Sequence, residues 1–132
     1  MRLILTALIF LFGLFDLFMG LSFLFTPAEA AVGFGLTAQG AIGLSTLRAD
    51  FTAFFCVIAV SMMWGAWRRN GDLLLVPAAL MGTAAVVRVF SLAVDGPYPG
   101  HLIPITVELL HVALLAAAWR VLPHHKIEEI AG

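Results

Sequence analysis

Four long apolar segments limit what this chain of 132 residues can fold into. They cover about residues 3–25, 47–67, 73–94 and 102–122, and each is close to the roughly 20 residues that a helix needs to cross the bilayer core. Apolar residues make up 62% of the chain, whereas average soluble domains contain about 45–50%. A domain this small cannot bury so much apolar surface internally. We therefore expect an integral membrane protein.

The spans are expected to be helices because backbone polar groups inside lipid must be satisfied within their own segment. Gly and Pro lie between the spans, as turns require. The connections at residues 68–72 and 95–101 are short and therefore make consecutive helices antiparallel neighbours. The predicted fold class is an all-α membrane protein: one domain, residues 1–132, forming an antiparallel bundle of four transmembrane helices.

The basic residues predict how the bundle is oriented. We name end A the end with both chain termini and the 68–72 turn, and end B the opposite end. Five of the seven Lys and Arg residues belong to end A: Arg2, Arg68, Arg69, Arg120 and Lys126. Trp64, Trp67 and Trp119 also fall at the end-A ends of their spans, as an interfacial aromatic belt would place them. The positive-inside rule then makes end A, with both termini, cytoplasmic.

The connection over residues 26–46 differs from the two short turns. It is rich in Gly and Ala and carries one charge, Glu29, so it is too apolar to be freely solvated. Long loops of compact domains are usually functional or disordered. Two interpretations stay open, a lid over the mouth of the bundle or an interfacial stretch without a gating role. Both predict that it packs at end B.

The first segment also resembles a signal peptide, because Ala28-Glu29-Ala30 is similar to a cleavage site. Its apolar run, however, exceeds the roughly 7–15 residues of a signal h-region. We expect the segment to be retained as a transmembrane span.

Ionisable residues lie within or at the edges of all four spans, in the half near end B. At about 1.5 Å per residue, Asp16 and His111 lie roughly 14 Å from end B, and Arg88 and Glu108 about 9–10 Å from it. Such residues are costly in a membrane and are candidates for a functional site. Their concentration at one end predicts a polar cavity open to end B. The candidates are Asp16, Arg48, Asp50, Arg88, Asp95, Glu108 and His111.

Helical spacing indicates which of these side chains point the same way. Glu108 and His111 are three residues apart and share a face. Arg88 and Asp95 are seven apart and also share a face, with Ser91 between them. These five residues are predicted to line the cavity.

Charge counting gives the cavity a surplus of negative groups. Arg48 and Asp50 cannot face the same way, and we expect the deeper Asp50 to point inward. Two arginines face four acids, Asp16, Asp50, Asp95 and Glu108. Because an unpaired buried carboxylate is protonated instead of charged, either one or two acids are neutral or a bound group balances them. The structural interpretation is that Arg88 pairs with Asp50 or Glu108 and fixes the helix register.

No sequence motif identifies a cofactor. The single Cys56 excludes an intramolecular disulfide and CxxC sites. Glu108-x-x-His111 is similar to half of a di-iron motif, but such sites need two copies and the two arginines would repel a metal, so no metal site is predicted. No nucleophile motif, Gly-rich phosphate loop or haem attachment site is present. The net charge of −1 argues against nucleic acid as a partner.

Three stretches resemble a bacterial family of small four-helix membrane proteins described as a domain of unknown function. They are Arg48-Ala49-Asp50-Phe51, the run Val87-Arg88-Val89-Phe90-Ser91-Leu92 with the following Asp95-Gly96-Pro97, and Glu108. This family is similar to the wider DoxX-like group, some of whose members are accessory subunits of quinone-linked enzymes. The resemblance covers nearly the whole chain and implies a four-helix bundle in the bacterial inner membrane with no established activity. It does not extend to Asp16 and His111.

Two classes of function fit these features. In the first, the polar cavity in the periplasmic half binds a lipophilic ligand, lipid or quinone-like, or the protein is an accessory subunit of a larger membrane complex or forms a homo-oligomer. In the second, the protein is a small membrane-embedded enzyme that uses a carboxylate pair for acid/base chemistry on a lipophilic substrate. Four spans without an inverted repeat disfavour a transporter. We expect Arg88 to lie at the centre of the site, with His111 one turn deeper.

Overall fold

The computed structural model describes residues 2–124, and every regular element within them is a helix. Four helices are long and apolar enough to cross a membrane, which confirms the all-α class. Lys126, counted above among the basic residues of end A, lies outside the described residues. In chain order the elements are α1 (Arg2–Phe25), α2 (Pro27–Val32), α3 (Gly40–Arg68), the 3-10 turn η1 (Asp72–Leu74), α4 (Leu75–Asp95) and α5 (Leu102–Val121).

The third element begins seven residues earlier than the apolar pattern indicated. The hydropathy pattern places the start of this span at residue 47, whereas α3 begins at Gly40 and contains 29 residues. Hydropathy falls at Ser45, Thr46 and Arg48, but none of these residues breaks a helix. A helix of this length spans about 43 Å, close to the thickness of a bilayer with its headgroup regions. The extra turns therefore belong to the interface at end B.

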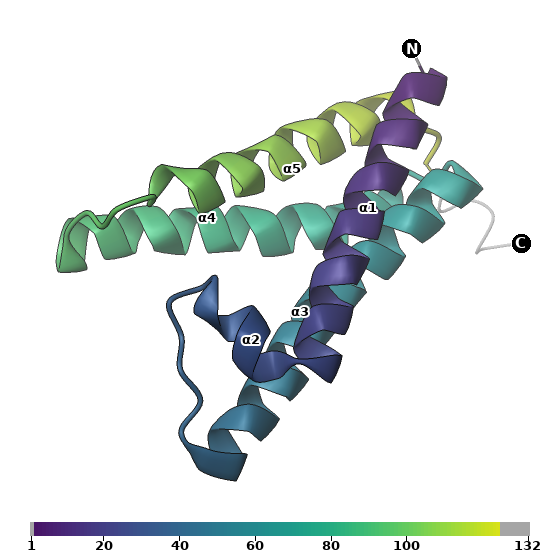
Figure 1. Cartoon of the computed structure of the whole chain (residues 1–132). Coiled ribbons are helices and arrows are strands. Elements are labelled where there is room, and N and C mark those ends of the chain that lie inside the picture. The colour runs from purple at the N-terminus through teal and green to yellow at the C-terminus, as the bar shows by residue number, and fades with distance from the viewer. Residues whose placement is uncertain (1, 125–132) are drawn as a thin grey trace, which may run out of the picture.

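The four long helices form two antiparallel hairpins, α1 with α3 and α4 with α5 (Figure 1). The hairpins meet at end A and diverge toward end B, so the bundle is closed at one end and open at the other. The backbone of α1 approaches that of α5 and the backbone of α3 that of α4, whereas no Cα atoms of α1 and α4, or of α3 and α5, lie within 8 Å of each other. At end A the N–H of Gly71 also donates to the carbonyl oxygen of Pro123 (2.9 Å), which ties the chain after α5 to the α3–α4 turn.

Two apolar clusters explain this shape. The cluster that joins both hairpins lies toward end A and contains Ile9, Ile58, Met62, Leu74 and Leu115, all fully buried. The second cluster lies toward end B, around Phe23, Ala31, Leu47 and Phe55, and draws on α1, α2 and α3 alone. Because α4 and α5 contribute nothing to the second cluster, they separate from the other hairpin at end B.

The connection between α1 and α3 packs at end B, as predicted. The ring of Phe34 lies against those of Phe23 and Phe51, with centroids 5.3 and 5.6 Å apart. The helix α2 contacts α1 and α3 but neither α4 nor α5. It therefore belongs to the first hairpin and does not bridge the open mouth as a lid across both hairpins would. An open depression of about 260 Å³ beside α2 is lined by no ionisable side chain.

Close approach of α1 and α3 depends on two glycines one heptad apart. A Cβ atom at Gly20 would lie 2.6 Å from Cys56 Sγ and 3.2 Å from the Cys56 backbone nitrogen. A Cβ atom at Gly13 would lie 2.8 Å from Met63 Cγ and 3.2 Å from the Ala59 carbonyl oxygen. Small residues at such positions let transmembrane helices pack closely.

Gly20→Ala is therefore expected to destabilise the protein by about 1–3 kcal/mol, because the backbone of α3 must move to admit a methyl group. Gly82→Ala is the matched control: its Cβ would meet Val112 Cγ2 at 3.7 Å, an ordinary contact. The control should be neutral or stabilise the protein by up to about 1 kcal/mol, because Ala has a higher helix propensity than Gly. Unfolding in detergent, followed by circular dichroism, measures both, and equal losses would contradict this role for Gly20.

Candidate functional site

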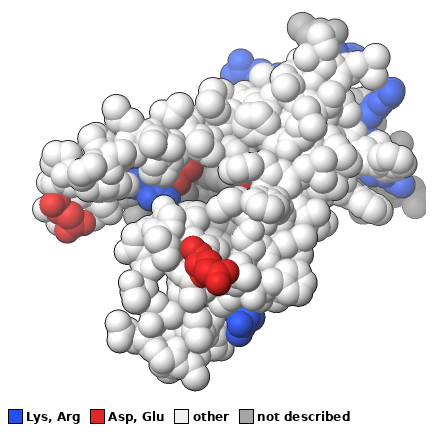
Figure 2. Space-filling model, in the orientation of Figure 1, with Lys and Arg blue, Asp and Glu red and all other residues white. Residues whose placement is uncertain are grey.

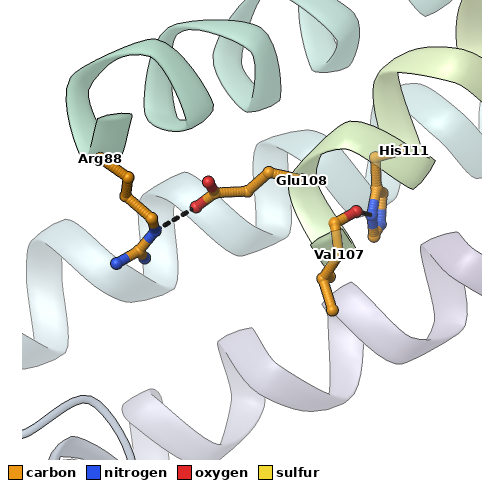
Figure 3. A network of polar contacts seen from close by, with 4 residues as sticks. All are labelled: Arg88, Val107, Glu108 and His111. Atoms are coloured by element: carbon orange, nitrogen blue, oxygen red, sulfur yellow. Dashed lines mark hydrogen bonds and ion pairs between the residues drawn. The ribbon is translucent and has the colours of Figure 1, made fainter. Parts of the chain in front are cut away.

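Four ionisable side chains from three helices form two polar pairs in the end-B half. The Arg88 Nε of α4 donates to Glu108 Oε1 of α5 at 2.6 Å (Figure 3). His111 Nε2, one turn further along α5, lies 3.1 Å from Asp16 Oδ2 of α1. α5 thus pairs with its hairpin partner through Glu108 and with the other hairpin through His111.

Only one partner of the Arg88–Glu108 pair is buried. The Glu108 side chain is 8% exposed, whereas that of Arg88 is 34% exposed. The two terminal nitrogens of the guanidinium point away from the carboxylate (Figure 3). Tyr98, in the α4–α5 connection, is close enough to interact electrostatically with Arg88. A guanidinium has five N–H donors, so these two contacts leave donors available for a bound group.

The space-filling view shows where this pair lies. The surface is hollowed between the α4–α5 hairpin and the rest of the molecule, and basic and acidic side chains lie together in the hollow (Figure 2). Arg88 is the one Lys or Arg residue on α4 and α5 before the last turn of α5. We call this hollow the crevice. Arg88 and Glu108 belong to α4 and α5, the hairpin that borders the crevice.

The Asp16–His111 pair is fully enclosed, and its geometry determines its proton count. His111 Nδ1 lies 2.8 Å from the carbonyl oxygen of Val107. Since a carbonyl oxygen only accepts, Nδ1 must carry a hydrogen. The contact between Nε2 and Asp16 Oδ2 then needs one further proton, either on the ring or on the carboxyl group. In both arrangements the net charge of the pair is zero.

One oxygen of each carboxylate has no partner. Asp16 Oδ1 and Glu108 Oε2 are buried and lack a hydrogen-bond partner among the residues that the structure describes. An unsatisfied buried polar group typically costs about 1–3 kcal/mol. Phe12 closes one side of the site, since its ring lies edge-on to that of His111 with centroids 4.8 Å apart. A water molecule or a bound group with a donor would satisfy these two oxygens.

The structure brings together four of the eight residues that the sequence suggested. Arg88, Glu108, His111 and Asp16 form the two pairs, and the pairing predicted between Arg88 and Glu108 is confirmed. The other four do not join them. Asp50 and Asp95 are exposed, Ser91 is half-buried, and Arg48 is exposed and donates from Nε to the Leu24 carbonyl oxygen at 3.0 Å.

The expected orientations of Arg48 and Asp50 are reversed. Thr52 marks the face of α3 that lies against α1, because its hydroxyl donates to the Gly20 carbonyl oxygen at 3.2 Å. Arg48 is one turn before Thr52 and shares this face, whereas Asp50 lies about 200° around the helix from it. Asp50 therefore does not pair with Arg88. Depth along the helix does not determine which side chain points inward. The face of α3 on which a residue lies determines it.

Sequence reasoning missed three contributors to the site: Phe12, Tyr98 and Val107. Phe12 is one turn before Asp16 on α1 and Val107 one turn before His111 on α5, so helical spacing from either predicted residue could have identified them. Tyr98 carried no such signal, because it follows Pro97 in an irregular turn. Among residues 2–124, no three His, Cys, Asp or Glu side chains gather as a metal site would require.

The chain was compared with known proteins and families. No match was found among curated proteins, and none among solved structures. One family model matches residues 4–119, from the first turn of α1 to the last turn of α5. On this match the chain belongs to the family described as Domain of unknown function (DUF4345).

Proposed function

We propose that this multi-pass membrane protein binds the polar head of a lipophilic molecule, lipid or quinone-like, in the crevice at end B. The observation that carries the proposal is Arg88, a permanent charge within a membrane-spanning helix that keeps N–H donors available beyond its bond to Glu108. Such a residue inside a membrane marks a functional site by default. By the distribution of basic residues, end B faces the periplasm.

The surroundings of the crevice suit an amphiphile. Arg88 lies seven residues before the end of α4, about 10 Å along the helix, which is within reach of a head that enters from the interface. The outer faces of the same hairpin are apolar and exposed at Val86, Val89, Phe90 and Leu109. The tail of an amphiphile whose head contacts Arg88 would lie in the lipid around this hairpin.

A membrane-embedded enzyme is the second candidate, and the Asp16–His111 pair favours it. The two carboxylates do not form an acid/base pair of their own, because each is engaged with a different basic side chain. The proton between His111 and Asp16 is instead the group that acid/base chemistry would use. Catalysis would require a substrate to reach this enclosed pair past Phe12, whereas binding at Arg88 requires no such access.

Lipid extraction followed by mass spectrometry tests the proposal. Wild-type protein, Arg88→Met and Arg48→Met are purified in the same mild detergent. Arg48→Met removes the same charge from an arginine outside the crevice. A lipophile enriched with wild type and Arg48→Met but lost from Arg88→Met is the expected result. Identical extracts from all three would contradict the proposal, and a co-purifying protein in place of a lipophile would indicate an accessory subunit.

The orientation is tested by cysteine labelling in a Cys56→Ala background. Arg68→Cys, at the end of α3, and Pro99→Cys, in the α4–α5 turn, are both exposed positions. A membrane-impermeant maleimide applied from the periplasm is expected to label position 99 in intact cells and position 68 only after the membrane is opened. Labelling of position 68 in intact cells would reverse the proposed topology.

A further inference from the structure

The polar groups of the site are already neutral as a set. Arg88 carries one positive charge and Glu108 one negative charge at 2.6 Å. The Asp16–His111 pair contributes zero, because the Val107 carbonyl oxygen keeps a hydrogen on Nδ1 and one shared proton occupies the contact with Asp16. The sum over all four groups is therefore zero without a ligand.

This neutrality determines which head group fits. An anion beside the terminal nitrogens of Arg88 would also lie close to Glu108, and a cation beside Glu108 would lie close to Arg88. In either case a repulsion reduces the attraction, and the ion loses its hydration in a crevice flanked by lipid. An uncharged acceptor loses little hydration and still receives a charge-assisted hydrogen bond from the guanidinium.

We infer that the crevice selects lipophiles with an uncharged, hydrogen-bond-accepting head, such as a carbonyl, hydroxyl or amide, over anionic or cationic amphiphiles with the same tail. The inference rests on the proposed function and names the ligand class. The other charged residues near end B, Glu29, Arg48, Asp50 and Asp95, are exposed and form no ion pair with the four groups in the described part of the chain. The count therefore includes only the four paired groups.

Three radiolabelled amphiphiles with the same hexadecyl tail test this selectivity: hexadecanamide, hexadecyl sulfate and hexadecyltrimethylammonium. Equilibrium binding to the purified wild-type protein in a non-ionic detergent is expected to be at least about tenfold tighter for the amide than for either ion, a difference equivalent to about 1.4 kcal/mol. This comparison needs no variant, so it does not depend on whether a substituted protein folds.

Two matched variants test whether the neutrality of the four groups causes this selectivity. Glu108→Gln leaves Arg88 without a counter-charge and should shift the preference to hexadecyl sulfate. Asp95→Asn makes the same chemical change at an exposed site on the end of α4 and should keep the wild-type order. Wild type that binds an ion as tightly as the amide, or equal shifts in both variants, would overturn the inference and leave the proposed function standing. Wild type that binds none of the three probes would overturn both.

Discussion

Arg88→Met is expected to lower the free energy of unfolding by about 2–3 kcal/mol and to abolish retention of the lipophile. Breaking a buried ion pair by removing one partner typically costs about 3–5 kcal/mol. We place the loss below that range because a third of the Arg88 side chain is exposed and solvent screens part of the interaction. Membrane insertion should not suffer, since α4 becomes more apolar.

Two comparisons isolate the pair from general damage to α4. Arg48→Met removes an exposed arginine whose bond is to a backbone carbonyl of α1, and it should cost less than about 1 kcal/mol. The double variant Arg88→Met/Glu108→Leu replaces both charges and should recover much of the stability lost by Arg88→Met, but not ligand retention. Thermal unfolding in one detergent measures these three variants and the single variant Glu108→Leu. A double variant as unstable as the sum of its parts would show that the pair does not couple α4 to α5.

The second large effect is expected at the pair that joins the hairpins. Asp16→Leu and His111→Phe should each destabilise the protein by about 2–3 kcal/mol, because each leaves a polar partner buried without a hydrogen bond. Neutral side-chain hydrogen bonds between transmembrane helices average only about 0.6 kcal/mol. We expect a larger loss of stability here because both side chains are 1% exposed and together hold an ionisable proton.

A double-mutant cycle measures this coupling. Asp16→Leu/His111→Phe should cost less than the sum of the single variants by about 2 kcal/mol, since neither polar group is left unpaired. Ser22→Ala on the same helix is the control. The Ser22 hydroxyl donates to the Phe18 carbonyl oxygen of α1 itself at 2.8 Å, so this variant removes a hydrogen bond within one helix and not between two. Simple additivity of the two single effects would mean that α1 and α5 are held together by apolar packing alone.

Four helices, their antiparallel order and the pairing of Arg88 with either Asp50 or Glu108 could be predicted from the sequence because each depends on local properties. About 20 apolar residues with internally satisfied backbone groups form a membrane-spanning helix whatever lies next to it. Short turns make sequential helices neighbours. A guanidinium cannot lose its charge, so Arg88 required a carboxylate, and Glu108 lies on the adjacent helix.

Only the tertiary structure decided how the hairpins are arranged and which side chains meet between them. Gly13 and Gly20 let α1 approach α3 closely, and the phenylalanine cluster at end B includes no residue of α4 or α5, so the hairpins diverge there. That divergence opens the crevice beside Arg88. The pairing of Asp16 with His111, 95 residues apart, and the outward turn of Asp50 depend on the rotation of each helix about its axis. Packing with the neighbouring helices sets that rotation, and no single span encodes it.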